Sequence, residues 1–400
     1  MRILFSTTAG AGHFGPLIPV ARAGSAAGHE VAVAAPASFA SHILSSGLPH
    51  LPFPDVPGDR MGAVFATLAQ LPRAEADRVV TSEVFGRLDA QAALPALIAI
   101  IAEMRPDVVV RDPSEFGSLV AARQAGIPSV QVAIGLDQLL VTIASWLEEP
   151  LRELQAMAGL EPAGSAELIL QTPTFTSVPP SLDASPIEAP SQKRRAIWRY
   201  RSQAQPAGPA LPGQWGDPTA PLVYVSFGSV AGSLGEFGAL YPAVLDVLAD
   251  LPVRVLLTTG AGFDPAQLQP LPANAWVTQW WPQEAAMTEA ALVIGHGGFG
   301  TTMSALRAGV PQIVLPLFSA DQFLNAERIE AVGAGLQLLG GLAGLDHVPD
   351  GVSKLLSQQR FTDAARTLAA EIAGLPDVDE CVAVLQHLAR WGENSTSGES

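Results

Sequence analysis

Cysteine is nearly absent from this chain of 400 residues, which contains only Cys381. A single cysteine excludes a disulfide framework and a cysteine-based zinc site within one chain, and it fits a reducing compartment. Long apolar runs are also missing: no stretch reaches the roughly 18 residues of a membrane-spanning helix, and the apolar run at the start is too short for a secretion signal. The longest candidate, 92–104, contains Pro95 and is predicted to be a core helix. We therefore expect a cytoplasmic protein without a membrane span.

Basic side chains are scarce as well, since 22 Lys and Arg face 38 Asp and Glu and leave a net charge of −16. Binding to nucleic acid or to an anionic membrane needs a basic surface that displaces counterions, so neither partner is expected. A local phosphate site is compatible with this charge if backbone N–H groups and a few placed side chains hold it. The chain is 48% hydrophobic and long enough for two or three domains.

Short apolar runs alternate with Ala- and Leu-rich helical stretches along the chain. Runs of Val, Ile and Leu without strict alternation are typical of strands buried on both faces of a parallel sheet. The repeated strand–helix order predicts a doubly wound α/β fold. The predicted strands are 2–7, 30–34, 107–111, 129–133, 222–226, 253–258, 275–278, 292–294 and 312–316.

This pattern occurs twice, on either side of a polar stretch rich in Pro and Gly that is typical of a linker. We predict two Rossmann-like domains at 1–201 and 219–388, a linker at 202–218 and a partly disordered tail at 389–400. Two further stretches, 57–97 and 136–172, have helical apolar spacing. They are predicted to cover the first sheet or to line a variable substrate pocket, and the sequence does not separate these alternatives.

The loop after the first strand, Gly10-Ala11-Gly12-His13-Phe14-Gly15, matches the G-x-G-x-x-G of dinucleotide-binding domains. A dehydrogenase also needs an acidic residue near the end of the second strand, where it holds the ribose hydroxyls. Here Glu30 lies at the start of that strand instead. The loop also places a bulky imidazole where a pyrophosphate would lie against bare backbone, so a dehydrogenase is disfavoured.

His13 is therefore a candidate general base. A position at a helix N-terminus disfavours the cationic imidazole, and a neutral imidazole can accept a proton at neutral pH. Asp112 follows the strand at 107–111, and the carboxyl ends of parallel strands open at one edge, so Asp112 is expected to orient His13. The alternative is an ordinary helix residue at His13 and a turn cap at Asp112, ahead of Pro113.

The second half contains a predicted anion site. A Gly-rich turn leads from the strand at 292–294 into a helix, and such a turn at a helix N-terminus binds phosphate groups. A pyrophosphate is expected to contact His296, Gly298, Phe299, Gly300 and Thr301, with further donors from Ser226, Gly228 and Ser229.

Other side chains near these loops suit a nucleoside and a sugar. Trp280 or Trp281 is expected to stack on a nucleobase, and Gln283 to reach a ribose. Asp321 and Gln322 place a carboxylate beside an amide, which suits the vicinal hydroxyls of a sugar. Buried core tryptophans and a helix N-cap at Asp321 are the alternative roles.

Taken in order, the G-x-G-H loop, the W-x-P-Q of 280–283, the H-G-G-x-G-T of 296–301 and the D-Q of 321–322 resemble the family 1 glycosyltransferases of the GT-B fold. The resemblance is strongest to the bacterial macrolide and antibiotic type and covers nearly the whole chain. It implies an acceptor-binding first domain and a nucleotide-sugar-binding second domain. By position it implies that His13 is the general base with Asp112 as its partner, and that Trp280 stacks on the base.

The resemblance also implies the reaction, an inverting transfer of a sugar from a dTDP- or UDP-sugar to a hydroxyl of a hydrophobic acceptor such as a polyketide, macrolide or flavonoid. Neither a cofactor nor a metal is expected. The D-x-D at Asp377 and Asp379 is predicted to cap the last helix. Members that use UDP-sugars often carry Glu where this chain has Ser304. A serine cannot bridge a ribose diol, which favours dTDP.

Acceptor contacts and assembly follow less directly from the sequence. The apolar acceptor is expected to contact Phe14, Phe65, Phe85 and Trp146, although core packing explains these aromatics equally well. A monomer or a homodimer is expected. Two alternative functions remain open: a catalytically inactive auxiliary protein of a glycosyltransferase, and a nucleotide-sugar epimerase.

Overall fold

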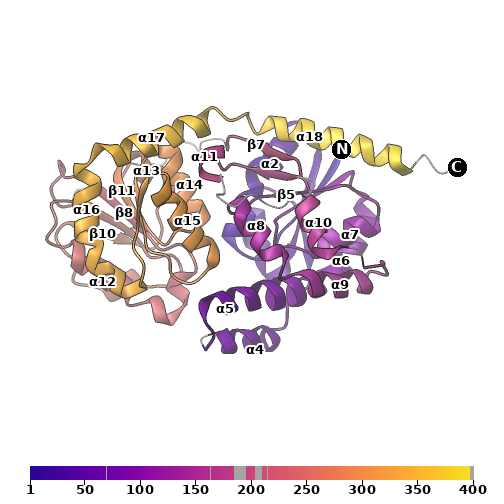
Figure 1. Ribbon diagram of the computed structural model, residues 1–400, viewed down its shortest axis with the longest axis horizontal. Coiled ribbons are helices and arrows are strands. Elements are labelled where there is room, and N and C mark those ends of the chain that lie inside the picture. Colours follow the sequence, from indigo (N-terminus) through magenta and orange to yellow (C-terminus); the bar gives the residue numbers. More distant parts are fainter. Residues whose placement is uncertain (69, 163, 184–194, 203–209, 214, 397–400) are drawn as a thin grey trace. The chain divides into compact units, whose positions relative to one another are not determined.

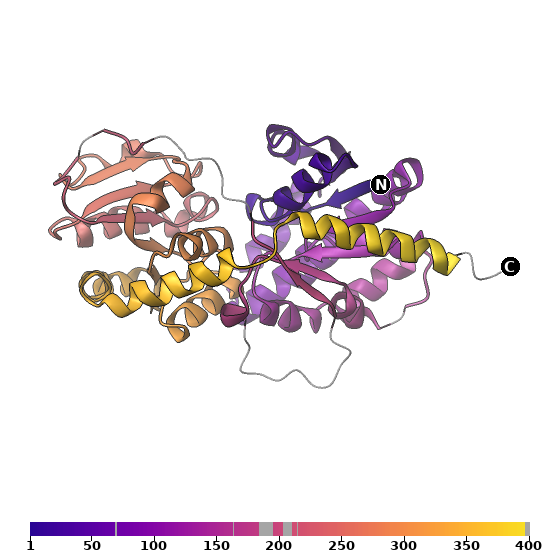
Figure 2. The same cartoon turned by 90° about the horizontal axis from the view of Figure 1, so that it is seen from above.

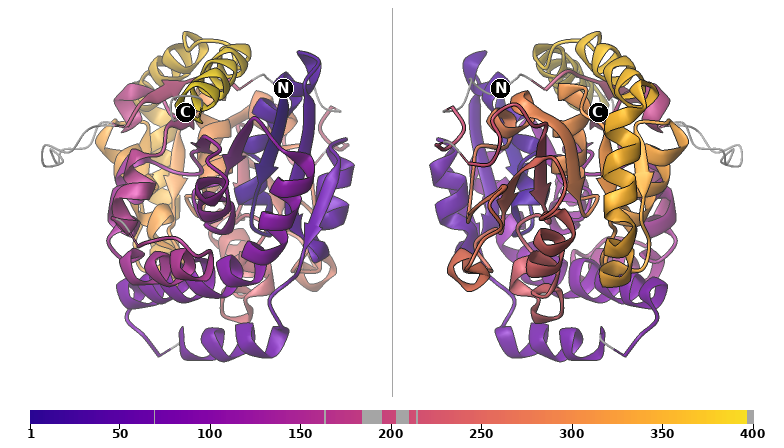
Figure 3. Two further views of the ribbon diagram at one scale, coloured as in Figure 1. Left: turned by 90° about the vertical axis from the view of Figure 1, so that its right-hand side faces the viewer. Right: turned by 90° about the vertical axis from the view of Figure 1, so that its left-hand side faces the viewer.

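The computed structural model describes residues 1–68, 70–162, 164–183, 195–202, 210–213 and 215–396 (Figure 1). Contacts divide the chain into two compact units, each built on one parallel sheet. The first unit comprises Met1–Ser177, Ser185–Gln203 and Leu375–Ser400, and the second comprises Val178–Ala184 and Ala204–Gly374. Figure 3 views the units from opposite ends and shows helices flanking the strands of each.

The first unit contains a seven-stranded parallel sheet in the order β3-β2-β1-β4-β5-β6-β7. Its strands are β1 (Arg2–Ser6), β2 (Glu30–Pro36), β3 (His50–Phe53), β4 (Val108–Arg111), β5 (Ser129–Val132), β6 (Thr174–Thr176) and β7 (Ile197–Arg199). From β1 the chain first builds outward to β3 and then returns to place β4 on the other side of β1. The loops after β1 and β4 therefore diverge at a topological switch point, where open α/β sheets bind ligands.

Both faces of this sheet are buried because successive side chains of a strand point to opposite faces. Ile3 and Phe5 of β1 belong to one core cluster, whereas Leu4 belongs to another. The helices of this unit are α1 (Ala11–Phe14), α2 (Leu17–Ala26), η1 (Ala37–Phe39), α3 (Ala40–Ser45), α4 (Gly58–Leu68), α5 (Arg73–Val79), the π-helix η2 (Val80–Asp89), α6 (Ala90–Met104), α7 (Gly117–Gln124), α8 (Asp137–Ala144), α9 (Glu148–Met157), α10 (Ser165–Gln171) and α18 (Asp379–Thr396). The helical spacing predicted for 57–97 and 136–172 is confirmed.

One helical run, Arg73–Met104, is long and apolar enough by length and composition to cross a membrane. It includes α6, which was predicted to be a core helix. Ala93, Leu94 and Leu97 of α6 are buried in the core cluster that contains residues of α7. Core helices of soluble proteins pass the same test, so a single run of this kind does not indicate a span.

The second unit contains a six-stranded parallel sheet in the order β10-β9-β8-β11-β12-β13. Its strands are β8 (Leu222–Ser226), β9 (Arg254–Thr258), β10 (Ala275–Thr278), β11 (Ala290–Gly295), β12 (Gln312–Val314) and β13 (Gly335–Gln337). Its helices are α11 (Pro180–Asp183), η3 (Ala231–Ser233), η4 (Gly235–Phe237), α12 (Leu240–Leu248), η5 (Pro265–Leu268), α13 (Gln283–Glu289), α14 (Phe299–Ala308), α15 (Ala320–Ala331), η6 (Gly341–His347), α16 (Val348–Ser357) and α17 (Gln359–Ala373). The switch point of this sheet lies between β8 and β11.

The C-terminal boundary differs from the prediction of a second domain at 219–388. The chain rejoins the first unit at Leu375, and α18 lies along that unit in Figures 1 and 2. The reason is an apolar stripe, since Val378, Cys381 and Leu385 are buried in the core cluster that contains residues of α2. Ion pairing between Arg201 and Asp377, at 2.8 Å, fixes the start of this segment.

All nine predicted strands are present, and four short strands, β3, β6, β7 and β13, were not predicted. These additional strands are brief segments without a continuous Val, Ile and Leu run. In the predicted linker at 202–218, residues 203–209 and 214 lie outside the described residues. In the predicted tail at 389–400, the chain is helical as far as Thr396, and 397–400 lie outside the described residues.

Candidate functional site

The loop after β1 presents His13. Gly10 precedes α1 with a φ of +136°, a conformation that favours glycine. The expectation that a helix dipole acts on His13 is wrong, because α1 has only four residues and His13 lies in its last turn. Gly12 and Gly15 complete this loop. The loop does not offer bare backbone to a phosphate, because the partly buried His13 side chain lies in it and contacts Asp112.

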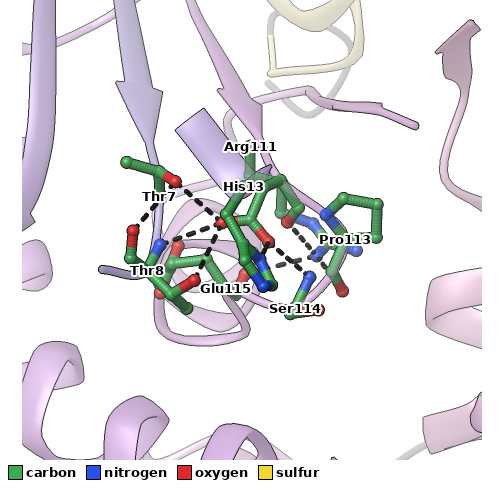
Figure 4. A network of polar contacts seen from close by, with 8 residues as sticks. Thr7, Thr8, His13, Arg111, Pro113, Ser114 and Glu115 are labelled. Carbon is green, nitrogen blue, oxygen red and sulfur yellow. Dashed lines mark hydrogen bonds and ion pairs between the residues drawn. The ribbon is translucent and has the colours of Figure 1, made fainter. Parts of the chain in front are cut away.

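Asp112 lies at the end of β4, next to β1, and its carboxylate is fully buried. Oδ1 lies 3.2 Å from Nδ1 of His13 and accepts the Ser114 N–H at 2.7 Å. Oδ2 accepts the Thr8 N–H at 2.9 Å and the Thr7 hydroxyl at 3.0 Å. Figure 4 shows these groups converging from the two loops. The predicted contact between His13 and Asp112 is confirmed, and the bond to Ser114 means that Asp112 also acts as the turn cap given as its alternative role.

The electrostatics of this pair favour an ionised carboxylate. Burial alone raises the pKa of Asp112, but the charge and hydrogen bond of His13, together with the Thr8 and Ser114 amides, bring that pKa below its ordinary value. An ionised carboxylate only accepts hydrogen bonds, so we expect Nδ1 of His13 to carry a proton in either charge state, and Nε2 to be the basic nitrogen when the ring is neutral.

The aromatic residues predicted to contact an acceptor have different surroundings. Phe85 of η2 lies beside the candidate base, with its ring centroid 5.3 Å from that of His13. Phe65 of α4 is 49% exposed, and Trp146, between α8 and α9, is partly buried. Phe14 is a correction: its ring is 3% exposed and packs edge-on against Phe39 in the core, so it offers no surface to an acceptor.

In the second unit, the turn after β11 places His296 at the switch point beside the end of β8. Two glycines bracket its ring. A Cβ on Gly228 would lie 2.7 Å from Cε1 of His296, and a Cβ on Gly298 would lie 2.5 Å from Nε2. Either side chain would collide with the imidazole, so the close approach of both loops to His296 requires glycine.

The charge state of His296 limits how this side chain contacts a phosphate. Burial lowers its pKa to about 4, and a hydrogen bond with the Ser226 backbone opposes this only in part. Its Nδ1 is buried and has no hydrogen-bond partner among the described residues. An imidazole contacts a phosphate either through a hydrogen bond of the neutral ring or through the charge of the protonated ring. The ring is neutral at neutral pH in the ligand-free protein, which favours the hydrogen bond.

The predicted nucleoside contacts occupy the loop from β10 to α13 and the first turns of α14. Trp280 is 71% exposed, whereas Trp281 packs against the core cluster that contains Trp215. Of the two candidates for stacking, the exposed one is Trp280. Gln283 donates from its amide to the Thr301 hydroxyl at 2.9 Å. Two side chains that were predicted to contact the sugar nucleotide are therefore hydrogen-bonded to each other in the ligand-free chain.

Ser304 has a partner that the sequence did not reveal. It is buried, and its hydroxyl donates to the Glu284 carboxylate at 3.2 Å, while Arg307 bonds both residues. Glu284 lies in the first turn of α13. A carboxylate from another helix therefore lies next to the serine, and Arg307 neutralises it.

The predicted sugar-binding pair begins α15. Asp321 is partly exposed in its first turn, and Ser319, not Asp321, is the residue before the helix. Gln322 is buried, and its Oε1 accepts the Leu317 N–H at 2.8 Å. The side-chain carbonyl of Gln322 therefore stabilises the loop after β12. Sequence reasoning missed Asn325, which is buried and donates to the Gly297 carbonyl at 2.7 Å. A polar residue at an inward-facing position of α15 was the signal that would have revealed it.

The remaining predicted contacts lie in the same two loops. Ser226 is buried and Ser229 is exposed. Gly300 has open space where a Cβ would stand, and Phe299 is largely buried.

The D-x-D residues lie in the first unit, where Asp377 pairs with Arg201 and accepts the Asp379 N–H at 3.3 Å at the start of α18. Among the described residues, no group of three or more acidic, His or Cys side chains is placed to hold a metal ion.

Comparison with known families matches both halves of the chain. Residues 22–188 match the family described as "Erythromycin biosynthesis protein CIII-like, N-terminal domain", and residues 242–388 match the corresponding C-terminal domain. The two matches lie on either side of the polar stretch that joins the sheets.

Individual proteins are similar over nearly the full length. The L-demethylnoviosyl transferase of Streptomyces niveus is 30% identical over 94% of this chain and 95% of its own. The elloramycin glycosyltransferase ElmGT of Streptomyces olivaceus is 30% identical over 100% of both chains. The solved structure of the spinosyn rhamnosyltransferase SpnG complexed with thymidine diphosphate has a TM-score of 0.77 at 26% identity and covers 96% of this chain and 100% of its own.

Proposed function

Because this chain belongs to the bacterial antibiotic-type family 1 glycosyltransferases, which have the two-domain GT-B fold, we propose that it transfers a sugar from a dTDP-sugar to a hydroxyl of a hydrophobic small molecule. The transfer inverts the anomeric carbon. The observation that carries the proposal is the 3.2 Å contact between Nδ1 of His13 and Oδ1 of the buried Asp112.

In the proposed mechanism His13 is the general base. Its Nε2 takes the proton of the acceptor hydroxyl while the oxygen of that hydroxyl bonds to the anomeric carbon, and the bond from that carbon to the diphosphate oxygen breaks. Asp112, held ionised by its amide and hydroxyl donors, stabilises the imidazolium that forms. Positioned base catalysis of this kind contributes about 10²- to 10⁴-fold to the rate.

The leaving nucleoside diphosphate carries the negative charge that develops. The N–H groups at the start of α14 and the Thr301 hydroxyl would bind its phosphate oxygens, as helix N-termini do. His296, neutral and with an unsatisfied Nδ1, would add a hydrogen bond rather than a charge. In this proposal the hydrogen bonds and the helix N-terminus stabilise the leaving group without a metal ion.

Two observations favour thymidine diphosphate. The related SpnG structure is described as a complex with thymidine diphosphate. In this chain Ser304 is bonded to Glu284 and Arg307, and a serine held in this way cannot chelate the two hydroxyls of a ribose. A deoxyribose presents only one hydroxyl and does not need that contact.

The acceptor is proposed to be apolar and aromatic or polycyclic. Phe85 lies against the ring of the base, and the exposed Phe65 belongs to the same helical stretch that precedes α6. Aromatic faces of this kind favour flat apolar ligands with a few polar groups, which is the usual make-up of small-molecule sites.

The test is product formation. The purified protein is incubated with dTDP- and UDP-sugars and a panel of polyketide and phenolic acceptors, and glycosides are detected by mass spectrometry. His13→Ala should lower turnover by about 10²- to 10⁴-fold with unchanged affinity for dTDP by calorimetry. His42→Ala, at an exposed histidine of α3, is the matched control and should keep full activity. Full activity of His13→Ala on the best acceptor would overturn the assignment.

A further inference from the structure

Arg111, the last residue of β4, is fully buried directly behind the candidate dyad. Its Nη1 donates to three backbone carbonyls of the next loop, those of Asp112 at 3.0 Å, Pro113 at 3.1 Å and Glu115 at 3.2 Å. A buried guanidinium is costly unless it is hydrogen-bonded and its charge is compensated. Its presence here calls for a role that an apolar residue could not fill.

The other arm of the guanidinium ties this loop to the sheet. Nη2 of Arg111 donates to Oε1 of Gln131 on β5 at 3.0 Å. Gln131 is itself buried, and its amide donates to the Thr174 hydroxyl on β6 at 3.0 Å. The chain of contacts thus runs from two neighbouring strands, through Gln131 and Arg111, to the backbone carbonyls of Asp112, Pro113 and Glu115.

Burial and two nearby acidic residues act in opposite directions on this guanidinium. Burial lowers the pKa of Arg111 to about 10, while the Glu115 and Asp112 carboxylates act in the opposite direction. Glu115, also fully buried, accepts the Ser118 N–H at 3.1 Å with each of its oxygens. The contacts of Arg111 in this loop are to backbone carbonyls, and Figure 4 shows Arg111, Pro113, Ser114 and Glu115 gathered around the dyad.

We propose that Arg111 is the positioning residue of the proposed base: by holding the carbonyls of the loop from Asp112 to Glu115, it fixes the direction in which the Asp112 carboxylate meets His13. Arg111 does not touch substrate and acts only through Asp112. This inference rests on the proposed function for its kinetic consequence, but the orientation of His13 that it predicts does not depend on any substrate.

Lysine cannot replace arginine in this role. The planar fork of Arg111 sends one nitrogen to the loop and the other to Gln131, whereas an ammonium presents its donors from a single point. Arg111→Lys keeps the charge and most of the volume but loses one of these two anchors. The loop then keeps the bond from the Asp112 N–H to the Ser6 carbonyl but loses its link to β5, and the direction of the carboxylate becomes less closely fixed.

The kinetic test is a double-mutant cycle. Arg111→Lys should lower kcat about 10- to 100-fold, as small misplacements of catalytic groups do, and should leave the KM for the sugar nucleotide within about twofold, because the proposed donor contacts lie in the second unit. Arg111→Lys combined with Asp112→Asn should be no slower than Asp112→Asn alone, since coupled residues are not additive. Losses that multiply would overturn the proposal. Arg123→Lys, on α7, is the matched control and should retain wild-type rates.

A spectroscopic test separates this inference from the proposed function. In protein labelled with ¹⁵N-histidine, the nitrogen shifts report the tautomer of His13, assigned by its loss in His13→Ala. The wild-type ring should carry its proton on Nδ1, and Arg111→Lys should show a mixture of tautomers without any substrate present. If Arg111→Lys does not fold cooperatively, Gln131→Met, which removes only the sheet anchor, takes its place in both tests. An unchanged tautomer in the folded variant would refute the positioning role even if the enzyme transfers sugar.

Discussion

Asp89 is the residue whose replacement gives the sharpest test of the electrostatics around the candidate base. It ends η2, one turn after Phe85, and is partly buried. Its carboxylate makes no hydrogen bond or ion pair with any residue that the structure describes. Burial, followed by the charge of Asp112, raises its pKa to about 6; Glu115 and Asp55 add to this, and His13 opposes it.

The size of the effect follows from this shift. A rise from 3.8 to about 6 corresponds to roughly 3 kcal/mol of penalty on the ionised form at 1.36 kcal/mol per pKa unit. Partial exposure reduces this to about 1–3 kcal/mol, because solvent screens the charge. The sign is fixed by the direction of the shift. Since the folded pKa is raised, the penalty is absent below the unfolded value, grows as pH rises towards 6, and is complete above it.

Asp89→Asn removes the charge and keeps the shape. The variant should therefore be more stable than the wild type by about 1–3 kcal/mol at pH 7.5, and the two proteins should be equally stable near pH 4. Unfolding by guanidinium at a series of pH values, followed by circular dichroism, measures the difference. Asp246→Asn, at an exposed position of α12, is the control and should show no such trend. A gain at Asp89 that is constant with pH, or larger at low pH, would refute the reasoning.

Three further predictions concern the second unit and the independence of the reaction from a metal ion. Gly298→Ala should abolish measurable dTDP binding by calorimetry while the fold persists, because its methyl group would displace the His296 ring; unchanged affinity would contradict the bracketing of His296. Trp280→Ala should weaken dTDP binding by about 1–3 kcal/mol, the value of one stacked base, with little change in melting temperature. Trp281→Ala should lower the melting temperature, because that ring packs in the core. The reverse pattern would exchange the roles of the two tryptophans. Addition of EDTA should leave the transfer rate unchanged, and a rate that falls and recovers on adding Mg²⁺ would show that the diphosphate needs a cation.

Much of the fold follows from local patterns in the sequence. Runs such as Leu222–Ser226 are short, apolar and preceded by proline, so each specifies a buried strand regardless of what it pairs with. The polar residues that follow strand ends are equally local. His13 and Asp112 were predicted to meet because parallel strands open at one edge, and they lie 3.2 Å apart. Their catalytic roles remain predictions.

Local patterns failed where a residue's partner lies far away in the sequence. Phe14 was taken as an acceptor contact although it faces Phe39 in the core, because an aromatic side chain in a loop gives no sign of its direction. Glu284 stands against Ser304, and Asn325 holds the Gly297 carbonyl. Neither pairing has a periodic signal, since the first joins two helices and the second joins a helix to the turn after β11, and these segments meet only in the folded unit.

The amino-acid sequence by itself thus determined which segments become strands, which loops carry an imidazole, a carboxylate or a glycine turn, and that the surface is acidic. These properties depend on neighbours along the chain. Only the tertiary structure decided that β4 returns beside β1 and β11 beside β8, that α18 closes the first core, and that Arg111 anchors the loop behind the dyad. Strand order and buried polar networks arise from contacts between distant segments, whose free energy exists only once both segments are packed together.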